Sequence, residues 1–304
     1  MGDDALGYLL LGVLKAFSKN LEIEAWILAD SNLSKRIAAK GFILNLSGDK
    51  HHISFDGTLS SFFEMTGEEF DIILISDFFK KTMERLSRLI ELDIKARELV
   101  VASKVLFPIA SINKLLAKKL PTRLIIFDGF TYWIGNEVRK TAGDTIYLQK
   151  KFDGLFPNIL KEPAEMAGIK VRIQPDFENI YWALMMNKLI VGMLSLLNIK
   201  PSDIIDSKNA RDIYNSLLED LEKVLRIEGI SLASLRLTVF HYLPRLRYLR
   251  DDALESLREW IFKDISYLSA IIGERVKTKN ITLKALPTIL KIMLALKDVS
   301  HTRD

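Results

Sequence analysis

The feature that most constrains the fold is an alternation of strand and helix patterns that stops at Pro175. Before this residue, short apolar runs alternate with segments of helical periodicity, whereas after it only helical periodicity continues, to about residue 297. Strand runs that are apolar almost throughout are typical of parallel sheets covered by helices on both faces. The sequence therefore predicts an α/β domain with a Rossmann-like parallel sheet, residues 1–174, followed by an all-α domain, residues 175–304.

Individual elements of the first domain follow from the same patterns. The strand runs cover residues 24–30, 70–76, 98–103, 123–127 and 170–173. The helical patterns between them cover residues 31–40, 80–91 and 111–120. Residues 42–46 and 51–55 have the pattern of a hairpin around a polar turn, and residues 131–148 that of antiparallel edge strands.

Composition excludes several classes of protein. The chain has 304 residues, 49% of them hydrophobic and 27% charged, which is ordinary for a soluble globular protein of about two domains. The charge excess of 43 − 39 = +4 is spread along the chain, so no nucleic-acid partner is expected. The apolar run at residues 184–199 is too short for a bilayer, so we expect no membrane partner. The lack of cysteine, together with many Ile, Leu, Lys and Arg residues, leads us to expect a cytoplasmic location. Cysteine is absent and His51 and His52 point to opposite faces of a strand, so no metal site is expected.

The N-terminal residues have the spacing of a dinucleotide-binding glycine loop. Gly2 and Gly7 take the outer positions of G-x-G-x-x-G, and Asp4 stands in place of the middle glycine. A helix follows, and the next strand ends in Asp30, where an acidic residue would bind a ribose. Gly2 directly follows Met1, so the first strand is expected to be missing or truncated. The alternative is a pair of acidic residues that simply favour a helix N-terminus.

A polar residue interrupts the apolar helix that follows Pro175. Ala183, Asn187 and Val191 are spaced four residues apart, so they share one face of that helix. An amide in an apolar environment is costly unless it finds a hydrogen-bond partner. Asn187 therefore either bonds to a neighbouring backbone group or faces a ligand.

The segment AGIKVRIQPDFENIYWALMMNKLIVGMLSLLN, residues 167–198, resembles the ketopantoate reductase (2-dehydropantoate 2-reductase) family. The resemblance runs nearly end to end and includes the glycine pattern and the strand at residues 70–76. Members of that family reduce a 2-oxo acid with NADPH, and a lysine acts as the general acid. The resemblance thus implies a small 2-oxo acid substrate and a nicotinamide dinucleotide cofactor.

Carried over residue by residue, the resemblance implies Asn187 and Ser256 as substrate-binding residues and Asp264 as the catalytic carboxylate. The family's lysine position is here Ala183, which supplies no proton. Lys104 lies beside the family's asparagine position at a strand end and is the candidate replacement for the acid, against the simpler interpretation of a solvated lysine. A lysine that often follows the strand at residues 70–76 is here Asp77.

The cofactor and the activity therefore stay open between alternatives. NADPH-binding relatives tend to carry a basic residue at the position of Asp30, so its carboxylate favours NAD over NADP. The alternative is that Lys35 and Arg36, one turn into the next helix, reach a 2′-phosphate. Asp4 places negative charge where a pyrophosphate would lie, so binding of neither cofactor is the alternative. The chain is then either an active reductase or a catalytically degenerate homologue that serves as a binding or assembly module. A homodimer through the helical domain is a further expectation.

Overall fold

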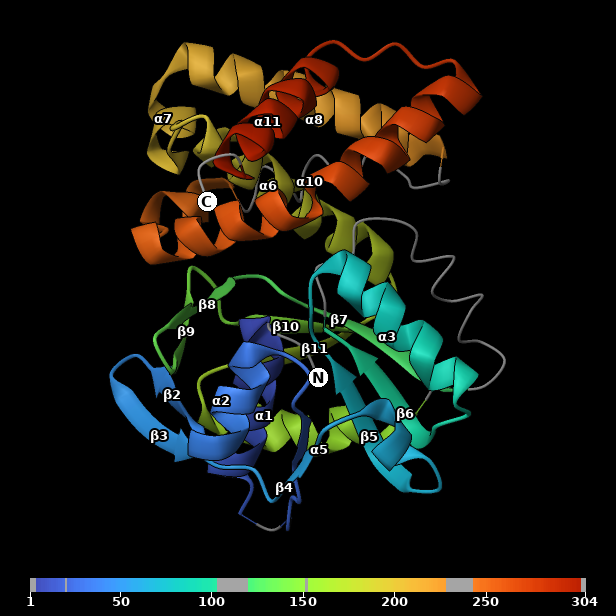
Figure 1. Ribbon diagram of the computed structural model, residues 1–304. Helices are drawn as coiled ribbons and strands as arrows, with labels where there is room; N and C mark the ends of the chain where they lie inside the picture. Colours follow the sequence, from blue (N-terminus) through green and yellow to red (C-terminus); the bar gives the residue numbers. More distant parts are fainter. Residues whose placement is uncertain (1–3, 20, 103–119, 151–152, 228–242, 302–304) are drawn as a thin grey trace. The chain divides into compact units, whose positions relative to one another are not determined.

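The computed structural model describes residues 4–19, 21–102, 120–150, 153–227 and 243–301. The chain forms two compact units, Met1–Phe177 and Glu178–Asp304, which we call the sheet unit and the helical unit and describe separately. The sequence places the change from strands to helices at residue 174, which is the last residue of a strand just before this division. Figure 1 shows the elements of each unit.

The described part of the sheet unit contains three sheets. The largest has the strand order β11-β10-β7-β6-β5, and its β10–β7 pair is antiparallel while its other pairs are parallel. A second sheet has the order β3-β2-β9-β8, and a third pairs β1 with β4 in parallel. The strands are β1 (Trp26–Leu28), β2 (Phe42–Leu46), β3 (Asp49–Ile53), β4 (Gly57–Leu59), β5 (Glu69–Ile75), β6 (Lys95–Val101), β7 (Thr122–Phe127), β8 (Phe130–Ile134), β9 (Glu137–Thr141), β10 (Thr145–Gln149) and β11 (Lys170–Gln174).

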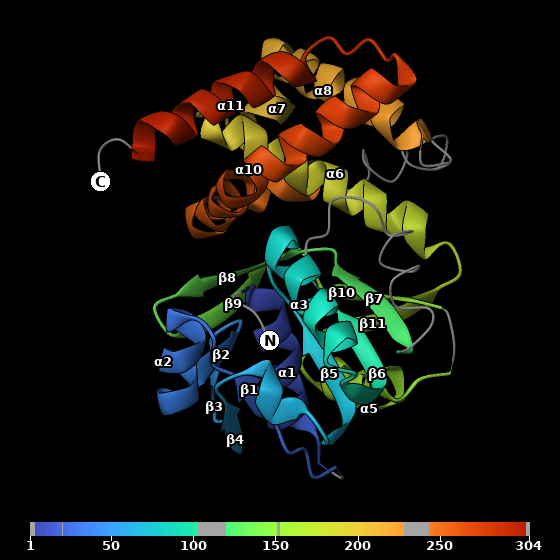
Figure 2. The same ribbon diagram turned by 45° about the vertical axis from the view of Figure 1, so that its right-hand side comes forward.

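Helices cover both faces of the five-stranded sheet, as the apolar strand runs predict. Every residue of β7 is buried, which requires cover on both sides. Figure 2 shows α3 over one face, with α1 and α5 behind the sheet on the other. The short helix η1 follows β4. The helices of this unit are α1 (Ala5–Phe17), α2 (Asn32–Lys40), η1 (Phe62–Met65), α3 (Phe79–Glu91) and α5 (Leu155–Met166).

The main core of the sheet unit forms around α1. Leu9, Leu10 and Val13 are fully buried in a cluster that also contains residues of β2, β6, β7, β10 and α5. Gly7 lets this helix approach β5, because a Cβ atom at residue 7 would lie 2.5 Å from the Cβ of Ser76. The glycine is therefore required by close packing of a helix on the residue that follows a strand.

Several expectations differ from the structure in detail. The hairpin of β2 and β3 is confirmed, but within residues 131–148 the strand β10 lies inside the five-stranded sheet and not at an edge. The helix expected at residues 111–120 lies almost entirely outside the described residues. The sequence patterns above do not include α5, which contains Pro157 and Pro163, residues that weaken a helical signal.

The described part of the helical unit contains helices and no strand, as expected from the loss of strand patterns after Pro175. Its first helix, α6, is long and apolar enough to cross a membrane by length and composition alone, but 83% of that stretch is buried, as in a core helix. The helices are α6 (Phe177–Leu196), α7 (Pro201–Asp206), α8 (Lys208–Ile227), η2 (Leu243–Tyr248), α10 (Asp251–Lys279) and α11 (Leu286–His301).

A buried carboxylate on α8 caps the start of α11. The oxygens of Asp220 accept hydrogen bonds from the backbone N–H groups of Lys284, Ala285 and Leu286 at 2.7–3.0 Å. Burial acts to raise the pKa of Asp220, but these backbone donors and Lys223 outweigh it and lower the pKa overall. The carboxylate therefore fixes α11 to α8 while it is ionised.

We predict that Asp220→Asn lowers the free energy of unfolding by about 1–3 kcal/mol at neutral pH, because three backbone donors lose a charged acceptor that is itself buried. A lowered pKa in the folded state stabilises the protein above the pKa of the unfolded carboxyl, and this contribution is lost as the pH falls through the folded value. The difference between wild type and variant should therefore shrink in acid, below about pH 4. Denaturant unfolding over a pH series measures it, with the exposed neighbour Glu219→Gln as the control.

We predict that Gly7→Ala destabilises the chain by about 1–3 kcal/mol, because the new methyl group collides with the Cβ of Ser76. Gly273→Ala in α10 is the matched control, since a Cβ there meets nothing within 4 Å. It should stabilise by about 0.5–1 kcal/mol through helix propensity. Equal effects of the two substitutions in chemical denaturation would contradict this account of Gly7.

Candidate functional site

Three polar side chains of the sheet unit, which include the predicted cofactor residue Asp30, lie at the ends of β1 and β5. Asp30 comes shortly after β1, and Ser76 and Asp77 directly follow β5. The N-terminus of α1 lies against the same place, since the N–H of Asp4 donates to the carbonyl of Ser76 at 3.3 Å. The carboxyl ends of strands and the N-termini of helices are the usual ligand sites of open α/β sheets. We call this region the carboxyl edge.

A single guanidinium links two of the carboxylates at the carboxyl edge. Arg85, on α3, donates from Nη1 and Nη2 to the two oxygens of Asp30 at 2.6 and 3.0 Å. Its Nε donates to Asp77 at 3.0 Å. A paired, fork-shaped contact of this kind is the strongest that arginine makes with a carboxylate.

The three groups differ sharply in their access to solvent. The side chains of Arg85 and Asp77 are 5% and 0% exposed, whereas that of Asp30 is 32% exposed. Burial raises the pKa of Asp77, and the charge of Arg85 opposes that rise. Burial acts against the charge of Arg85, but its two aspartates outweigh this and raise its pKa. With both aspartates ionised, the cluster carries one net negative charge.

The N-terminus of α1 already has its own acceptors. The side chain of Asp4 caps the helix by accepting from the N–H of Leu6 at 3.0 Å. The N–H of Gly7 donates to the hydroxyl of Ser76 at 2.9 Å. Asp4 is 3% exposed, so its carboxylate lies within the helix terminus and not in open solvent. The contacts of Asp4 agree with the alternative stated above, in which an acidic residue favours a helix N-terminus. Gly2, the first glycine of the predicted loop, lies outside the described residues.

The carboxyl edge suits the ribose of a nicotinamide dinucleotide, at Asp30, better than it suits the pyrophosphate, at the start of α1. Asp30 is partly exposed, and a carboxylate that accepts two bonds from Arg85 keeps lone pairs for ribose hydroxyls. At the start of α1, the N–H groups of Leu6 and Gly7 already donate to Asp4 and Ser76. A pyrophosphate placed there would have to displace the carboxylate of Asp4.

In the helical unit, Asn187 is engaged by groups of its own bundle. Its Nδ2 donates to the carbonyl of Ala183 at 3.1 Å, and its Oδ1 accepts from the hydroxyl of Tyr214, on α8, at 2.5 Å. Burial raises the pKa of Tyr214, so its hydroxyl stays a donor. Asn187 is 2% exposed. Of the two alternatives for this amide, the structure shows the bond to a neighbouring backbone group, and a substrate role stays a prediction.

The other two predicted residues of the helical unit lie on α10. Asp264 is 3% exposed and accepts from Nε1 of Trp260, one turn earlier, at 3.1 Å. Ser256 is partly exposed and lies two turns before Asp264, on the same side of the helix. Lys104 lies outside the described residues. The roles predicted for these residues therefore stay predictions.

Two residues of these clusters carry no motif and were not predicted. Arg85 is one of several charged residues on an amphipathic helix, and its spacing from Asp30 and Asp77 gives no sign of contact. Tyr214 is one apolar-face residue among many on α8. The sequence held a partial signal for Arg85. Asp77 stands where the resembled family often has a lysine, and a carboxylate that is buried there needs a positively charged partner.

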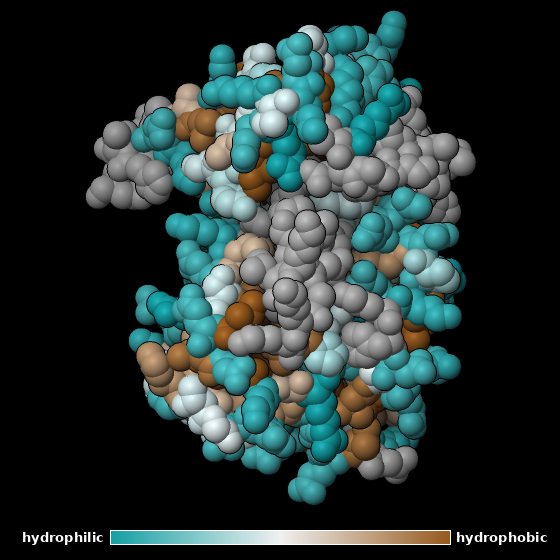
Figure 3. All heavy atoms as spheres, turned by 90° about the vertical axis from the view of Figure 1, so that its right-hand side faces the viewer, coloured by the Kyte–Doolittle hydropathy of each residue, from teal (hydrophilic) through white to brown (hydrophobic). Residues whose placement is uncertain are grey.

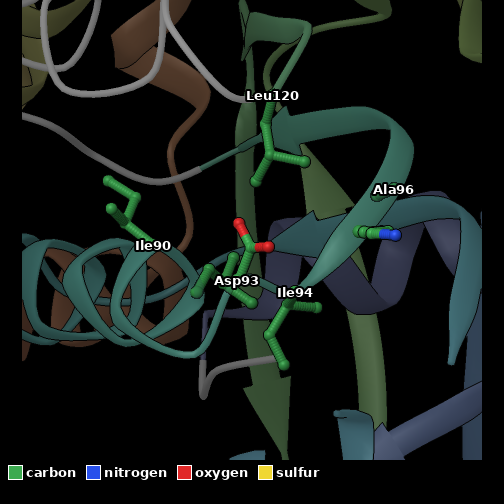
Figure 4. Close-up of a pocket in the computed structure, with 7 residues that line it drawn as sticks. Ile90, Asp93, Ile94, Ala96 and Leu120 are labelled. Carbon is green, nitrogen blue, oxygen red and sulfur yellow. The ribbon is translucent and has the colours of Figure 1, made fainter. Parts of the chain in front are cut away.

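Other surfaces of the described residues offer less. The structure shows no group of three His, Asp or Glu side chains in its described ranges that is placed to hold a metal. A small pocket lies between the end of α3 and the start of β6, which is the end of β6 opposite to its carboxyl end; Asp93, Ile94 and Leu120 are among the lining residues drawn in Figure 4. Most of the described surface on the face in Figure 3 is hydrophilic, with small apolar patches.

Comparison with known proteins shows which solved structures share the fold of this chain. No protein-family model matches the sequence, and no curated protein matches it. Among solved structures, a ketopantoate reductase from Ralstonia eutropha JMP134 superimposes with a TM-score of 0.74 at 13% identity, over 99% of this chain and 98% of that one.

Two other solved structures give similar values. D-mandelate dehydrogenase with NADH and anilino(oxo)acetate superimposes with a TM-score of 0.72 at 14% identity, over 96% of this chain and 95% of that one. A 2-dehydropantoate 2-reductase from Methylococcus capsulatus gives 0.67 at 12% identity, over 99% and 96%. These likenesses confirm the predicted fold class: the chain has the fold of the ketopantoate reductases along nearly its whole length.

Proposed function

We propose that the chain is a nicotinamide-dependent reductase of small 2-oxo acids, of the ketopantoate reductase type. The observation that carries the proposal is a fold shared end to end with ketopantoate reductases and with a dehydrogenase solved with NADH. The carboxyl edge supports it, because Asp30 is held in a fixed orientation where a ribose would bind.

NAD(H) is the cofactor that this edge favours. The carboxylate of Asp30 accepts hydrogen bonds from ribose hydroxyls but repels a 2′-phosphate. The adjacent Asp77 adds a second negative charge, Arg85 pairs with both carboxylates, and the charge of Lys81 also acts on Asp77. Tighter binding of NADPH than of NADH in separate titrations would contradict this assignment.

In this proposal a nicotinamide cofactor held at Asp30 would supply the hydride for the carbonyl carbon of the substrate. Asn187 and Ser256 bind the 2-oxo acid, and Asp264 orients it. Lys104 donates the proton to the carbonyl oxygen, because Ala183 cannot. The carbonyl of Ala183 and the hydroxyl of Tyr214 already bond to the amide of Asn187, so a substrate would share this amide with them.

A second candidate is a homologue that has kept the fold and lost the chemistry. Three observations favour it: Ala183 at the position of the general acid, the bonds of Asn187 within its own bundle, and the carboxylate of Asp4 at the start of α1. Such a chain would act as a binding or assembly module, for example as a homodimer through its helical unit. Purified protein that consumes NADH with ketopantoate supports the reductase, whereas no turnover and no cofactor binding support the module.

We predict that Asp4→Gly raises the affinity for NADH about tenfold, because a carboxylate no longer competes with the cofactor phosphates at α1. A charge repulsion of about 1–4 kcal/mol is removed, while the loss of the cap to glycine costs only a few tenths of a kcal/mol. Isothermal titration calorimetry measures the change. The control is Asp203→Gly, which removes a carboxylate that accepts from the N–H of Lys200 at the start of α7 in the helical unit and should leave NADH affinity unchanged.

We predict that Lys104→Ala lowers kcat for 2-oxo acid reduction by about 10²–10⁴, the usual cost of losing a positioned general acid. NADH binding should stay the same, and saturating NADH at about a hundred times its Kd should still stabilise the variant by about 2.7 kcal/mol. Unchanged turnover in an active preparation would show that Lys104 is not the acid.

A further inference from the structure

We infer that Arg85 is a latent binding group for a 2′-phosphate and that Asp30 determines cofactor specificity by occupying it. The inference rests on the proposed function, since it concerns the ribose end of the same cofactor site. It goes beyond the assignment of Asp30 as a ribose ligand, because it makes the aspartate's partner the group that would bind NADP(H).

The geometry at the carboxyl edge supports this role. Asp30 takes both terminal nitrogens of Arg85 in a paired contact, which is also the geometry in which arginine binds a phosphate. A phosphate group in the place of the Asp30 carboxylate would therefore find the same two donors already aligned. Asp77 would keep its bond from Nε and hold the guanidinium in position.

Differences in exposure place Asp30 on the solvent side of the cluster. Its side chain is 32% exposed, against 5% for Arg85 and 0% for Asp77. Because Arg85 is almost fully covered, a ligand reaches its terminal nitrogens by taking the place of Asp30. An NAD ribose needs no such exchange, since Asp30 can accept its hydroxyls while it stays bonded to Arg85.

The charges at the carboxyl edge also indicate that Asp30 prevents a 2′-phosphate from binding to Arg85. With Asp30 present and both aspartates ionised, its carboxylate occupies the two terminal nitrogens of Arg85 and its negative charge repels a phosphate dianion at that place. With Asp30 replaced by a neutral residue, the remaining pair of Arg85 and Asp77 is neutral and two N–H donors lose their acceptor. A buried donor without an acceptor is unfavourable, so the variant gains by binding a phosphate.

The test compares two ligands that lack a reactive nicotinamide, ADP-ribose and 2′-phospho-ADP-ribose, by isothermal titration calorimetry. Wild type should bind ADP-ribose at least about tenfold more tightly. Asp30→Ser should bind 2′-phospho-ADP-ribose more tightly than ADP-ribose, a reversal of about a hundredfold in the ratio. The double variant Asp30→Ser with Arg85→Lys should lose most of this gain, because lysine lacks the paired donors.

Asp71→Ser is the matched control for charge. It also removes a carboxylate from β5, and its partner Arg97 lies at 3.1 Å, but both side chains are largely exposed and lie away from the carboxyl edge. Its ligand preference should equal that of wild type. Melting temperatures of all variants show whether the fold is kept.

The two possible failures can be told apart. If Asp30→Ser binds ADP-ribose but keeps the wild-type preference, the inference about Arg85 is overturned and the reductase proposal stands. If neither ligand binds to wild type, Asp4→Gly or Asp30→Ser while all of them stay folded, both proposals are overturned. A reversal that persists in the double variant shows that Arg85 is not the phosphate-binding group.

Discussion

The ion pairs of Arg85 connect the ends of two strands, β1 and β5, that lie in different sheets of the sheet unit. Asp30 follows β1, a strand of the two-stranded sheet, whereas Asp77 follows β5, at the edge of the five-stranded sheet. Within the described residues, no strand pairing links β1 to β5. Removing Arg85 would take the guanidinium away from the fully buried carboxylate of Asp77, and losing one partner of a buried ion pair costs about 3–5 kcal/mol. The same contact therefore stabilises the carboxyl edge and decides which groups remain available there for a ligand.

Much of the fold could be predicted from the sequence, because the spacing of apolar residues shows which positions of a strand or helix are buried. The apolar runs that form β5, β6 and β7 indicate strands covered on both faces, and the loss of such runs after Pro175 indicates the helical unit. The division into three sheets could not be predicted in the same way. Strand partners depend on pairings between distant residues, such as Ile43 with Glu137 in β2 and β9, and no local pattern encodes them.

The candidate site was predicted less completely, because its polar residues bind one another. Asp30 and Asp4 stand where the motif places them, but the motif does not reveal that Arg85 and the N–H of Leu6 already bind their carboxylates. Asn187 likewise stood out as a polar residue on an apolar helix, while its partner Tyr214 did not. A polar residue in an apolar helix departs from the pattern around it and is easy to find in the sequence. Its hydrogen-bond partner fits the pattern of its own helix, so the sequence does not reveal it.

Taken together, the sheet unit has a Rossmann-like fold in which the polar groups of the carboxyl edge are paired with one another, and we propose that a nicotinamide dinucleotide binds at this edge. The measurement that tests this most directly is an NMR titration of the ¹⁵N-labelled chain with NADH. If the account is correct, the backbone amide signals of Leu6, Gly7 and Asp30 shift together and saturate at one ligand per chain. Saturating NADH that leaves these three signals in place, or that shifts signals elsewhere alone, would contradict it.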